Sequence, residues 1–142
     1  MKIITYLLSI LILCYLSSRA SAQNQKPADQ ITGLYWSPKK DAKIEIYKKG
    51  EHYFGRSIWV ANPRKDNKNP NENLKTREVL GIELLTDFAF DEGVYTSGRI
   101  YDPESGRTYD CKMTMNGDDL KVRGYIGISL FGRTEIFKRI KL

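Results

Sequence analysis

The residues of this chain with the clearest capacity for molecular recognition are its aromatic residues and its arginines. The sequence holds nine tyrosines and two tryptophans in 142 residues. Their rings offer apolar contact, while hydroxyl and indole N–H groups can orient a bound molecule. Neighbouring arginines could hold a carboxylate. The candidate ligand-binding residues are Tyr35, Trp36, Trp59, Arg99, Tyr101, Tyr109, Arg123, Tyr125 and Arg133. The alternative is that these aromatic rings only fill a core.

Groups that commonly act in catalysis are scarce. His52 is the only histidine, which nearly excludes a Ser-His-Asp triad or a histidine-rich zinc site. Cys111 is on the apolar side of its strand, between Tyr109 and Met113, so we expect a buried, unreactive side chain. Oxygen-bearing side chains at 66–73 have the density of a calcium loop but lack a matching bidentate carboxylate. We therefore expect no catalytic residue, no metal and no cofactor.

An enzyme acting on carbohydrate or lipid would need two carboxyl groups facing each other about 5–9 Å apart. Several acidic residues could form such a pair, but nothing in their spacing singles one out. These candidates are Glu45, Glu51, Glu83, Asp102 and Asp110. We expect a protein that is not an enzyme, and only a facing pair in a pocket would revive the alternative.

The elements that must position these residues are short antiparallel strands. Residues 109–115 alternate between apolar and polar, as in a strand with one buried face. Asn116-Gly117 follows, and both types tolerate the positive φ of a two-residue hairpin turn. Residues 120–126 alternate again. We count roughly eight such strands, and a closed up-and-down β-barrel would leave no exposed edges. A β-sandwich is the competing architecture.

Other segments predict local features of this all-β fold. Gly55 lies in the middle of a strand at 51–60, which indicates a bulge or a sharp bend. Residues 61–76 are rich in Asn and Pro and form a long loop, in which Asn71 could cap a short helical turn. Residues 87–93, with Phe88 and Phe90, are interpreted as a turn region.

The first 22 residues are predicted to be a signal peptide, cut after Ala22. A positive start precedes an apolar run at 3–16, which is shorter than a membrane-spanning helix, and Ala20-Ser21-Ala22 is a small-residue cleavage site. We expect residues 23–142 to form one domain of an exported protein, periplasmic or secreted. That domain would have no stable membrane span.

The charge balance argues against a nucleic-acid partner. The formal net charge is +6, and it falls to +4 when Lys2 and Arg19 leave with the signal peptide. The remaining basic residues are interspersed with acidic ones rather than gathered in one block.

Four sequence segments together resemble a family of exported bacterial proteins, family 2147 in the domain-of-unknown-function series. The resemblance extends from Gly33 to Phe137. The segments are Asp66-Asn67-Lys68-Asn69-Pro70, Leu80-Gly81, the run 98–109, and the run 120–127 followed by Phe131-Gly132-Arg133-Thr134.

The resemblance implies a lipocalin-like (calycin) barrel. In such barrels an N-terminal Gly-x-Trp packs against an arginine of the last strand. Here Tyr35 or Trp36, with Arg139 or Arg133, could form that cation–π pair. The family supplies no catalytic residues and no established ligand.

Two functional hypotheses follow. The first is an exported, non-enzymatic lipocalin-like protein that binds a small amphipathic, fatty acid-like ligand in the barrel. The alternative is an envelope module that binds a protein or the cell wall through the 61–76 loop.

Overall fold

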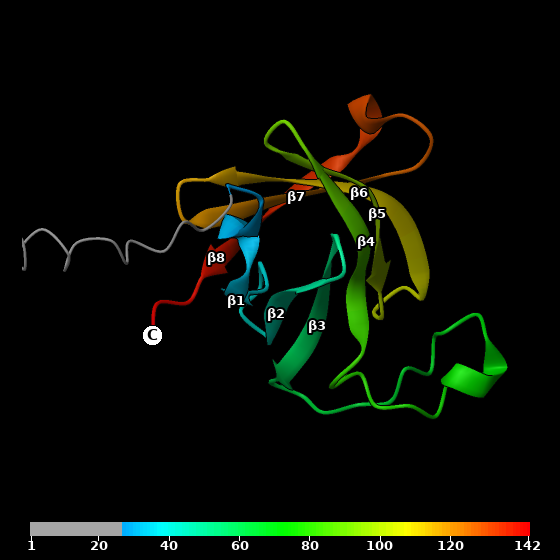
Figure 1. Ribbon diagram of the computed structural model, residues 1–142. Coiled ribbons are helices and arrows are strands. Elements are labelled where there is room, and N and C mark those ends of the chain that lie inside the picture. The colour runs from blue at the N-terminus through cyan, green and yellow to red at the C-terminus, as the bar shows by residue number, and fades with distance from the viewer. Residues whose placement is uncertain (1–26) are drawn as a thin grey trace, which may run out of the picture.

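The computed structural model describes residues 27–142, which form a closed antiparallel barrel of eight strands (Figure 1). Each strand pairs with the next, and β8 closes the barrel against β1. The strands are β1 (Gly33–Trp36), β2 (Ala42–Lys49), β3 (His52–Val60), β4 (Glu83–Asp91), β5 (Val94–Asp102), β6 (Arg107–Asn116), β7 (Asp119–Tyr125) and β8 (Arg133–Arg139). The predicted up-and-down barrel is confirmed, and the sandwich is excluded. The predicted signal peptide lies outside the described residues.

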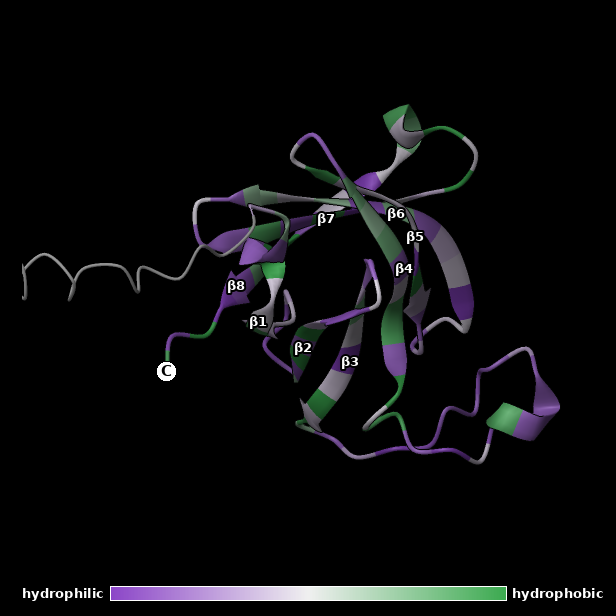
Figure 2. Ribbon diagram, in the orientation of Figure 1, coloured by the Kyte–Doolittle hydropathy of each residue, from purple (hydrophilic) through white to green (hydrophobic). Residues whose placement is uncertain are grey.

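Alternating side chains build the barrel core, as Figure 2 shows by the change of hydropathy along the strands. On β6, Cys111 and Met113 are fully buried, while the intervening Lys112 is only partly covered. Burial raises the pKa of the Cys111 thiol to about 12, so the thiol stays protonated at neutral pH. The expectation of a buried cysteine is confirmed.

The interpretation of residues 87–93 as a turn region is wrong, because β4 continues to Asp91 and the turn is only Glu92-Gly93. Asp87 and Ser97 have positive φ angles of 64° and 62°, and both lie between the pairs Thr86–Arg99 and Ala89–Thr96, where the β4–β5 register continues without a shift. Each of the two strands therefore contains one residue in a conformation typical of turns, although the strand pairing continues through it. The buried ring of Phe88 packs directly over Gly98. A Cβ atom at position 98 would lie only 2.4 Å from the ring atoms. Glycine at position 98 therefore makes room for the ring.

A short 3-10 helix, η2 (Pro27–Ile31), closes one end of the barrel. Three tyrosine hydroxyls from inside the barrel donate hydrogen bonds to it. The pairs are Tyr35 with the Ile31 carbonyl at 2.8 Å, Tyr53 with Asp29 Oδ1 at 2.5 Å and Tyr95 with the Ala28 carbonyl at 2.6 Å. All three tyrosines are buried, so they are core residues that attach η2 to the closed end of the barrel.

Arg139 at the end of β8 lies over the ring of Tyr35, 4.7 Å from the ring centroid. Its guanidinium also donates to the Tyr35 hydroxyl. The cation–π pair implied by the family resemblance is therefore present, and it uses Tyr35 and Arg139. Trp36 instead packs edge-to-face against Trp59, with ring centroids 5.8 Å apart.

The four longer connections lie at the opposite, open end, because in an up-and-down barrel every second connection returns to the same rim. They are residues 37–41, 61–82, 103–106 and 126–132. In Figure 1, connection 61–82 projects at the lower right, with its short 3-10 helix η3 (Glu72–Leu74). The Asn71 side chain caps η3 by accepting from the Asn73 amide at 3.0 Å, as the sequence predicted.

Candidate functional site: a cavity at the open end of the barrel

A cavity of about 510 Å³ lies at the open rim and extends into the barrel. Its wall is formed by inward-facing strand residues, and its rim by residues of the connections and strand ends. The apolar and aromatic wall includes Ile44, Leu85, Ile100, Tyr109, Val122 and Phe137. The charged rim includes Lys39, Asp41, Arg64, Glu104, Arg133 and Glu135. An apolar interior with a charged mouth suits a molecule that has an apolar body and a polar head.

One ion pair crosses the mouth of the cavity. Lys39 Nζ lies 2.9 Å from Glu104 Oε2. Lys39 belongs to the β1–β2 turn and Glu104 to the β5–β6 turn, which are four strands apart around an eight-stranded barrel. Both side chains are more than half exposed, so the pair adds little stability and can separate readily.

Arg64 is the rim cation with the clearest freedom to meet an anion. Arg133 is paired with Glu135, their Nε and Oε1 atoms being 2.5 Å apart, and Lys39 is paired with Glu104. Among the described residues, no ion pair involves Arg64, which is exposed and lines the cavity. Sequence reasoning missed this residue, since the only signal was a basic side chain at the start of a long loop.

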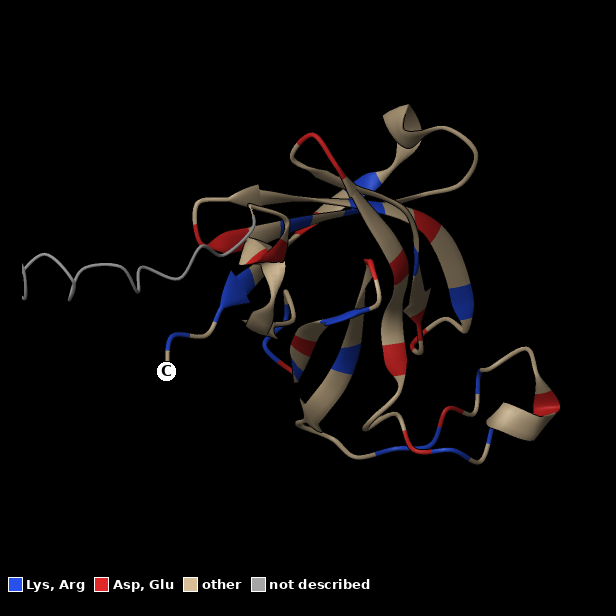
Figure 3. Ribbon diagram, viewed as in Figure 1, with Lys and Arg blue, Asp and Glu red and all other residues tan. Residues whose placement is uncertain are grey.

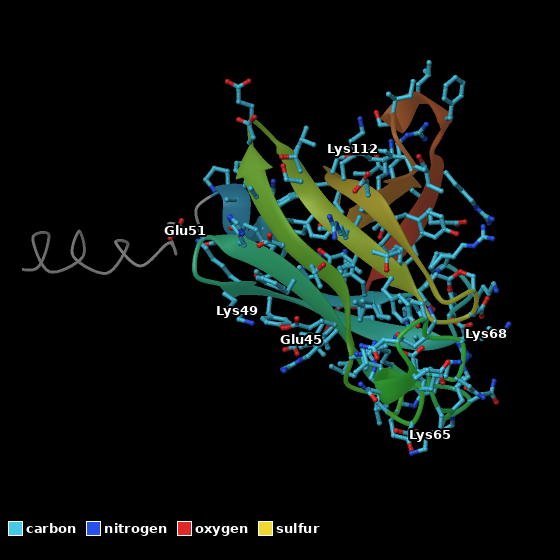
Figure 4. The ribbon with its side chains drawn as sticks, turned by 90° about the vertical axis from the view of Figure 1, so that its right-hand side faces the viewer. Glu45, Lys49, Glu51, Lys65, Lys68 and Lys112 are labelled. Carbon is cyan, nitrogen blue, oxygen red and sulfur yellow. The ribbon has the colours of Figure 1, made fainter. Side chains whose placement is uncertain are left out.

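Connection 61–82 forms part of the cavity wall through Asn62, Arg64 and Val79. It folds back on itself through a bridge between Lys65 and Glu78. It also packs against the β5–β6 turn, where a Cβ on Gly106 would lie 1.9 Å from the Lys68 carbonyl oxygen. The connection is therefore a docked element of the open end; Figure 4 labels Lys65 and Lys68 on it.

Asp66 fixes this connection to the barrel. Its carboxylate is fully buried, and it accepts hydrogen bonds from the Tyr101 hydroxyl at 2.5 Å, Asn69 Nδ2 at 2.8 Å and Arg77 Nε at 2.9 Å. Burial by itself would raise the pKa of Asp66, but the hydrogen bonds from Tyr101, Asn69 and Arg77 outweigh it and hold the pKa below its usual value. These donors occupy the carboxylate of Asp66, the one acidic side chain among the calcium-like oxygen groups noted in the sequence.

The cavity wall contains three of the nine candidate ligand-binding residues, namely Tyr101, Tyr109 and Arg133. The remaining six lie elsewhere. Tyr35 is at the closed end, and Arg99 is exposed on β5. Arg123 donates to backbone carbonyls of connection 126–132, and Tyr125 ends β7 just before that connection.

Trp36 and Trp59 are on the outside of the barrel. The β2–β3 register shifts at Lys43 and Ile44, which pair with Trp59 and Ser57 respectively. Ile58 is the extra residue of this bulge, and it turns the following tryptophan outward, where Trp59 is 40% exposed. The bulge predicted at Gly55 is also present, as shifts in the β3–β4 register on both sides of Gly55.

The side chains that could act in catalysis are dispersed. His52 pairs with Asp87 at 2.5 Å on the surface, whereas Cys111 is buried in the core. Within residues 27–142, no group of three or more His, Cys, Asp or Glu side chains could hold a metal ion. No helix in this part of the chain is long and apolar enough to cross a membrane.

The fold and the cavity define the class of this protein as a lipocalin-like barrel. A solved structure with the same architecture is protein HP1028 of Helicobacter pylori, described as belonging to the lipocalin family. The two structures align with a TM-score of 0.71 at 23% sequence identity, covering 78% of this chain and 83% of the other.

Residues 33–139 match the family described as uncharacterized proteins conserved in bacteria, DUF2147. The chain therefore belongs to the DUF2147 family, as its sequence motifs indicated. No curated protein sequence matches it significantly.

Proposed function

We propose that this protein is an exported, non-enzymatic lipocalin-like protein that binds one small amphipathic, fatty acid-like molecule in the barrel. The observation that carries the proposal is the cavity of about 510 Å³ with an apolar wall and a charged rim. This volume falls within the range of small-molecule sites, roughly 300–1,000 Å³. The lipocalin-like architecture supports the same conclusion, since barrels of this size can enclose one small ligand.

The arrangement of the wall suggests how such a molecule would lie. An acyl chain would contact Ile100, Val122 and Phe137, where burial of apolar surface favours binding by about 25 cal/mol per Å². A carboxylate at the other end would remain at the rim beside Arg64. Tyr101 and Tyr109 provide ring surface between these two regions.

Filling the cavity is expected to abolish binding. Ile100 lines the cavity and is only partly buried, so Ile100→Trp places an indole in the space that an acyl chain would occupy. We expect the affinity for a fluorescent fatty acid analogue to fall by roughly tenfold or more, since about 1.4 kcal/mol corresponds to each factor of ten. Arg99→Trp is the matched control, because the preceding residue is exposed on the same strand. That variant should bind normally.

Native mass spectrometry of protein purified from its own host tests the same proposal without a chosen probe. A co-purified amphipathic molecule that is lost in the Ile100→Trp variant supports it. If nothing co-purifies and the fluorescent analogue fails to bind the unaltered protein, the proposal is overturned.

The role of Arg64 is tested with two ligands that differ only in the head group. Arg64→Gln should weaken binding of a fatty acid by roughly fivefold to twentyfold, in line with the loss of one charge-assisted hydrogen bond. Binding of the fatty alcohol with the same chain should change little. Equal losses for both ligands would show that Arg64 supports the rim rather than holding the anion.

A further inference from the structure

Connection 126–132, between β7 and β8, exposes large apolar side chains at the rim of the barrel. Ile126 is 74% exposed, Ile128 57%, Leu130 75% and Phe131 81%. Surface hydrophobic residues are ordinary when scattered singly, but a cluster of this kind marks an interaction site. Figure 2 shows the connection, with its 3-10 helix η4 (Ser129–Phe131), largely in the hydrophobic colour.

Two cations, Arg123 and Lys112, hold this apolar connection in place. Arg123 donates from Nε to the Ser129 carbonyl at 2.7 Å and from Nη2 to the Leu130 carbonyl at 3.1 Å. Its Nη1 atom donates to Thr134 Oγ1 at 2.7 Å, across the base of the connection. Lys112 Nζ donates to the Ser129 hydroxyl at 3.1 Å, and Figure 4 labels this lysine beside the connection. The apolar side chains are thus preorganised for a partner rather than folded back onto the barrel.

The charged residues around the connection indicate which kind of partner would bind there. Figure 3 shows the connection itself without charged residues and basic segments at its base. In the parts of β6, β7 and β8 next to the connection, residues 107–112, 122–125 and 133–135, four basic residues stand against two acidic ones. They are Arg107, Lys112, Arg123 and Arg133, against Asp110 and Glu135. A hydrophobic tip above a basic base is complementary to an anionic lipid surface, where apolar groups enter the interface and cations meet the head groups.

The shape of the connection also favours a bilayer over a protein. The connection is a narrow projection at the top right of Figure 1. A stable protein interface buries roughly 800 Å² on each partner, usually with some 20–30 residues, whereas this connection has only the residues 126–132. A bilayer interface can receive a few projecting side chains without any complementary pocket.

We propose that connection 126–132 is a membrane-docking element that inserts its apolar side chains into the interface of an anionic bilayer. Arg133, which directly follows it, lines the cavity, so docking would bring the mouth of the barrel next to the lipid surface. An amphipathic guest could then pass between bilayer and cavity with little exposure to water. Docking itself requires no guest and stands apart from the ligand-binding proposal.

The test places a tryptophan at the tip, in Phe131→Trp, in the full chain. With vesicles of phosphatidylglycerol and phosphatidylcholine in equal parts, the introduced indole should emit at shorter wavelength. It should also be quenched by lipids brominated on the acyl chain. The unaltered protein, with Trp36 and Trp59, provides the background signal. Ile58→Trp is the matched control, because residue 58 is an exposed apolar side chain on β3, away from the connection. Its indole should not be quenched.

A second variant tests the energetic role of the apolar tip. The double substitution Leu130→Ser and Phe131→Ser should lower partitioning onto these vesicles by roughly tenfold or more, while Ile58→Ser should not. Pure phosphatidylcholine vesicles and high salt should weaken binding of the unaltered protein. No fatty acid is added, so failure here would leave ligand binding untouched.

Three outcomes would overturn the proposal. One is an indole at position 131 whose emission wavelength does not change with anionic vesicles and whose fluorescence brominated lipids do not quench. This result reports on the connection itself, even if the apolar run at 3–16 binds the vesicles. Another is equal partitioning of the double variant and the parent. The last is a concentration-dependent dimer that the double variant abolishes without any lipid quenching, which would make a second copy of this chain the partner.

Discussion

Replacing Asp66 with alanine is expected to release connection 61–82 from the barrel. The substitution leaves the Tyr101 hydroxyl, the Asn69 amide and the Arg77 guanidinium without their shared acceptor. Removing one partner of a buried ion pair typically costs about 3–5 kcal/mol. Because Arg77 is about one-third exposed and can turn to water, we expect the lower end, about 3 kcal/mol. Hydrogen-exchange protection of residues 64–79 should therefore fall by about a hundredfold.

A matched control lies in the same connection. Glu72 is an exposed acidic residue whose ion pair with Lys75 spans one turn at the surface. Glu72→Ala should change the protection of 64–79 very little, because exposed pairs contribute about 0–1 kcal/mol. Asp66→Asn should behave like Asp66→Ala, since its amide group presents N–H donors to Arg77. Normal protection in either Asp66 variant would show that packing at Gly106 alone holds the connection.

The pH dependence of this docking follows from the lowered pKa of Asp66. Its pKa is below the usual 3.8 in the folded protein, so the unfolded or undocked state binds a proton more readily. The stabilisation is therefore fully present above pH 3.8 and is lost as the pH falls through the lower, folded pKa. The protection difference between the parent and Asp66→Ala should be constant from pH 5 to 7 and shrink below pH 3.8. A difference that persists unchanged at lower pH would contradict this assignment.

The barrel could be predicted because its strands alternate clearly between apolar and polar residues and its turns contain residue types that favour turn conformations. Asn116-Gly117 with the alternation on both sides determines the β6–β7 hairpin, whose register pairs Asn116 with Asp119. Prediction failed where a strand contains residues with positive φ. Asp87 in β4 is of a type common in turns and has a positive φ, yet the β4–β5 pairing continues past it without a register shift, which the sequence of β4 alone does not reveal.

The cavity was harder to predict because single-strand periodicity cannot locate bulges. One extra residue, Ile58, moves Trp59 from the predicted inward face to the outer surface. Periodicity does place Tyr109 correctly on the apolar face, since it lies opposite Ile100 on regular parts of β5 and β6 and lines the cavity. The rim residues come from turns, where no periodicity applies. Lys39 and Glu104 meet only because closure of the barrel brings two distant turns together.

Replacing Arg139 with alanine is expected to cost about 3–4 kcal/mol of unfolding free energy, a loss within the range of large-to-small substitutions in a core. Its guanidinium joins three parts of the closed end. Nη1 donates to the Thr32 carbonyl at 2.9 Å and Nη2 to the Gln30 carbonyl at 2.6 Å, which fixes the end of η2 and the residue that follows it. Nε donates to the Asp118 carbonyl at 3.0 Å in the β6–β7 turn, while the cation covers the ring of Tyr35.

Arg139→Lys should recover less than half of that loss, because one ammonium group cannot reproduce the planar set of donors that reaches three carbonyls at once. Lys138→Ala is the matched control, since the adjacent side chain is exposed and makes a surface ion pair with Asp119. It should change stability by less than about 1 kcal/mol. Urea unfolding followed by the fluorescence of Trp36 and Trp59 measures all three variants. Full recovery by lysine would mean that the positive charge over the Tyr35 ring, rather than the hydrogen bonds to the backbone, keeps this end of the barrel closed.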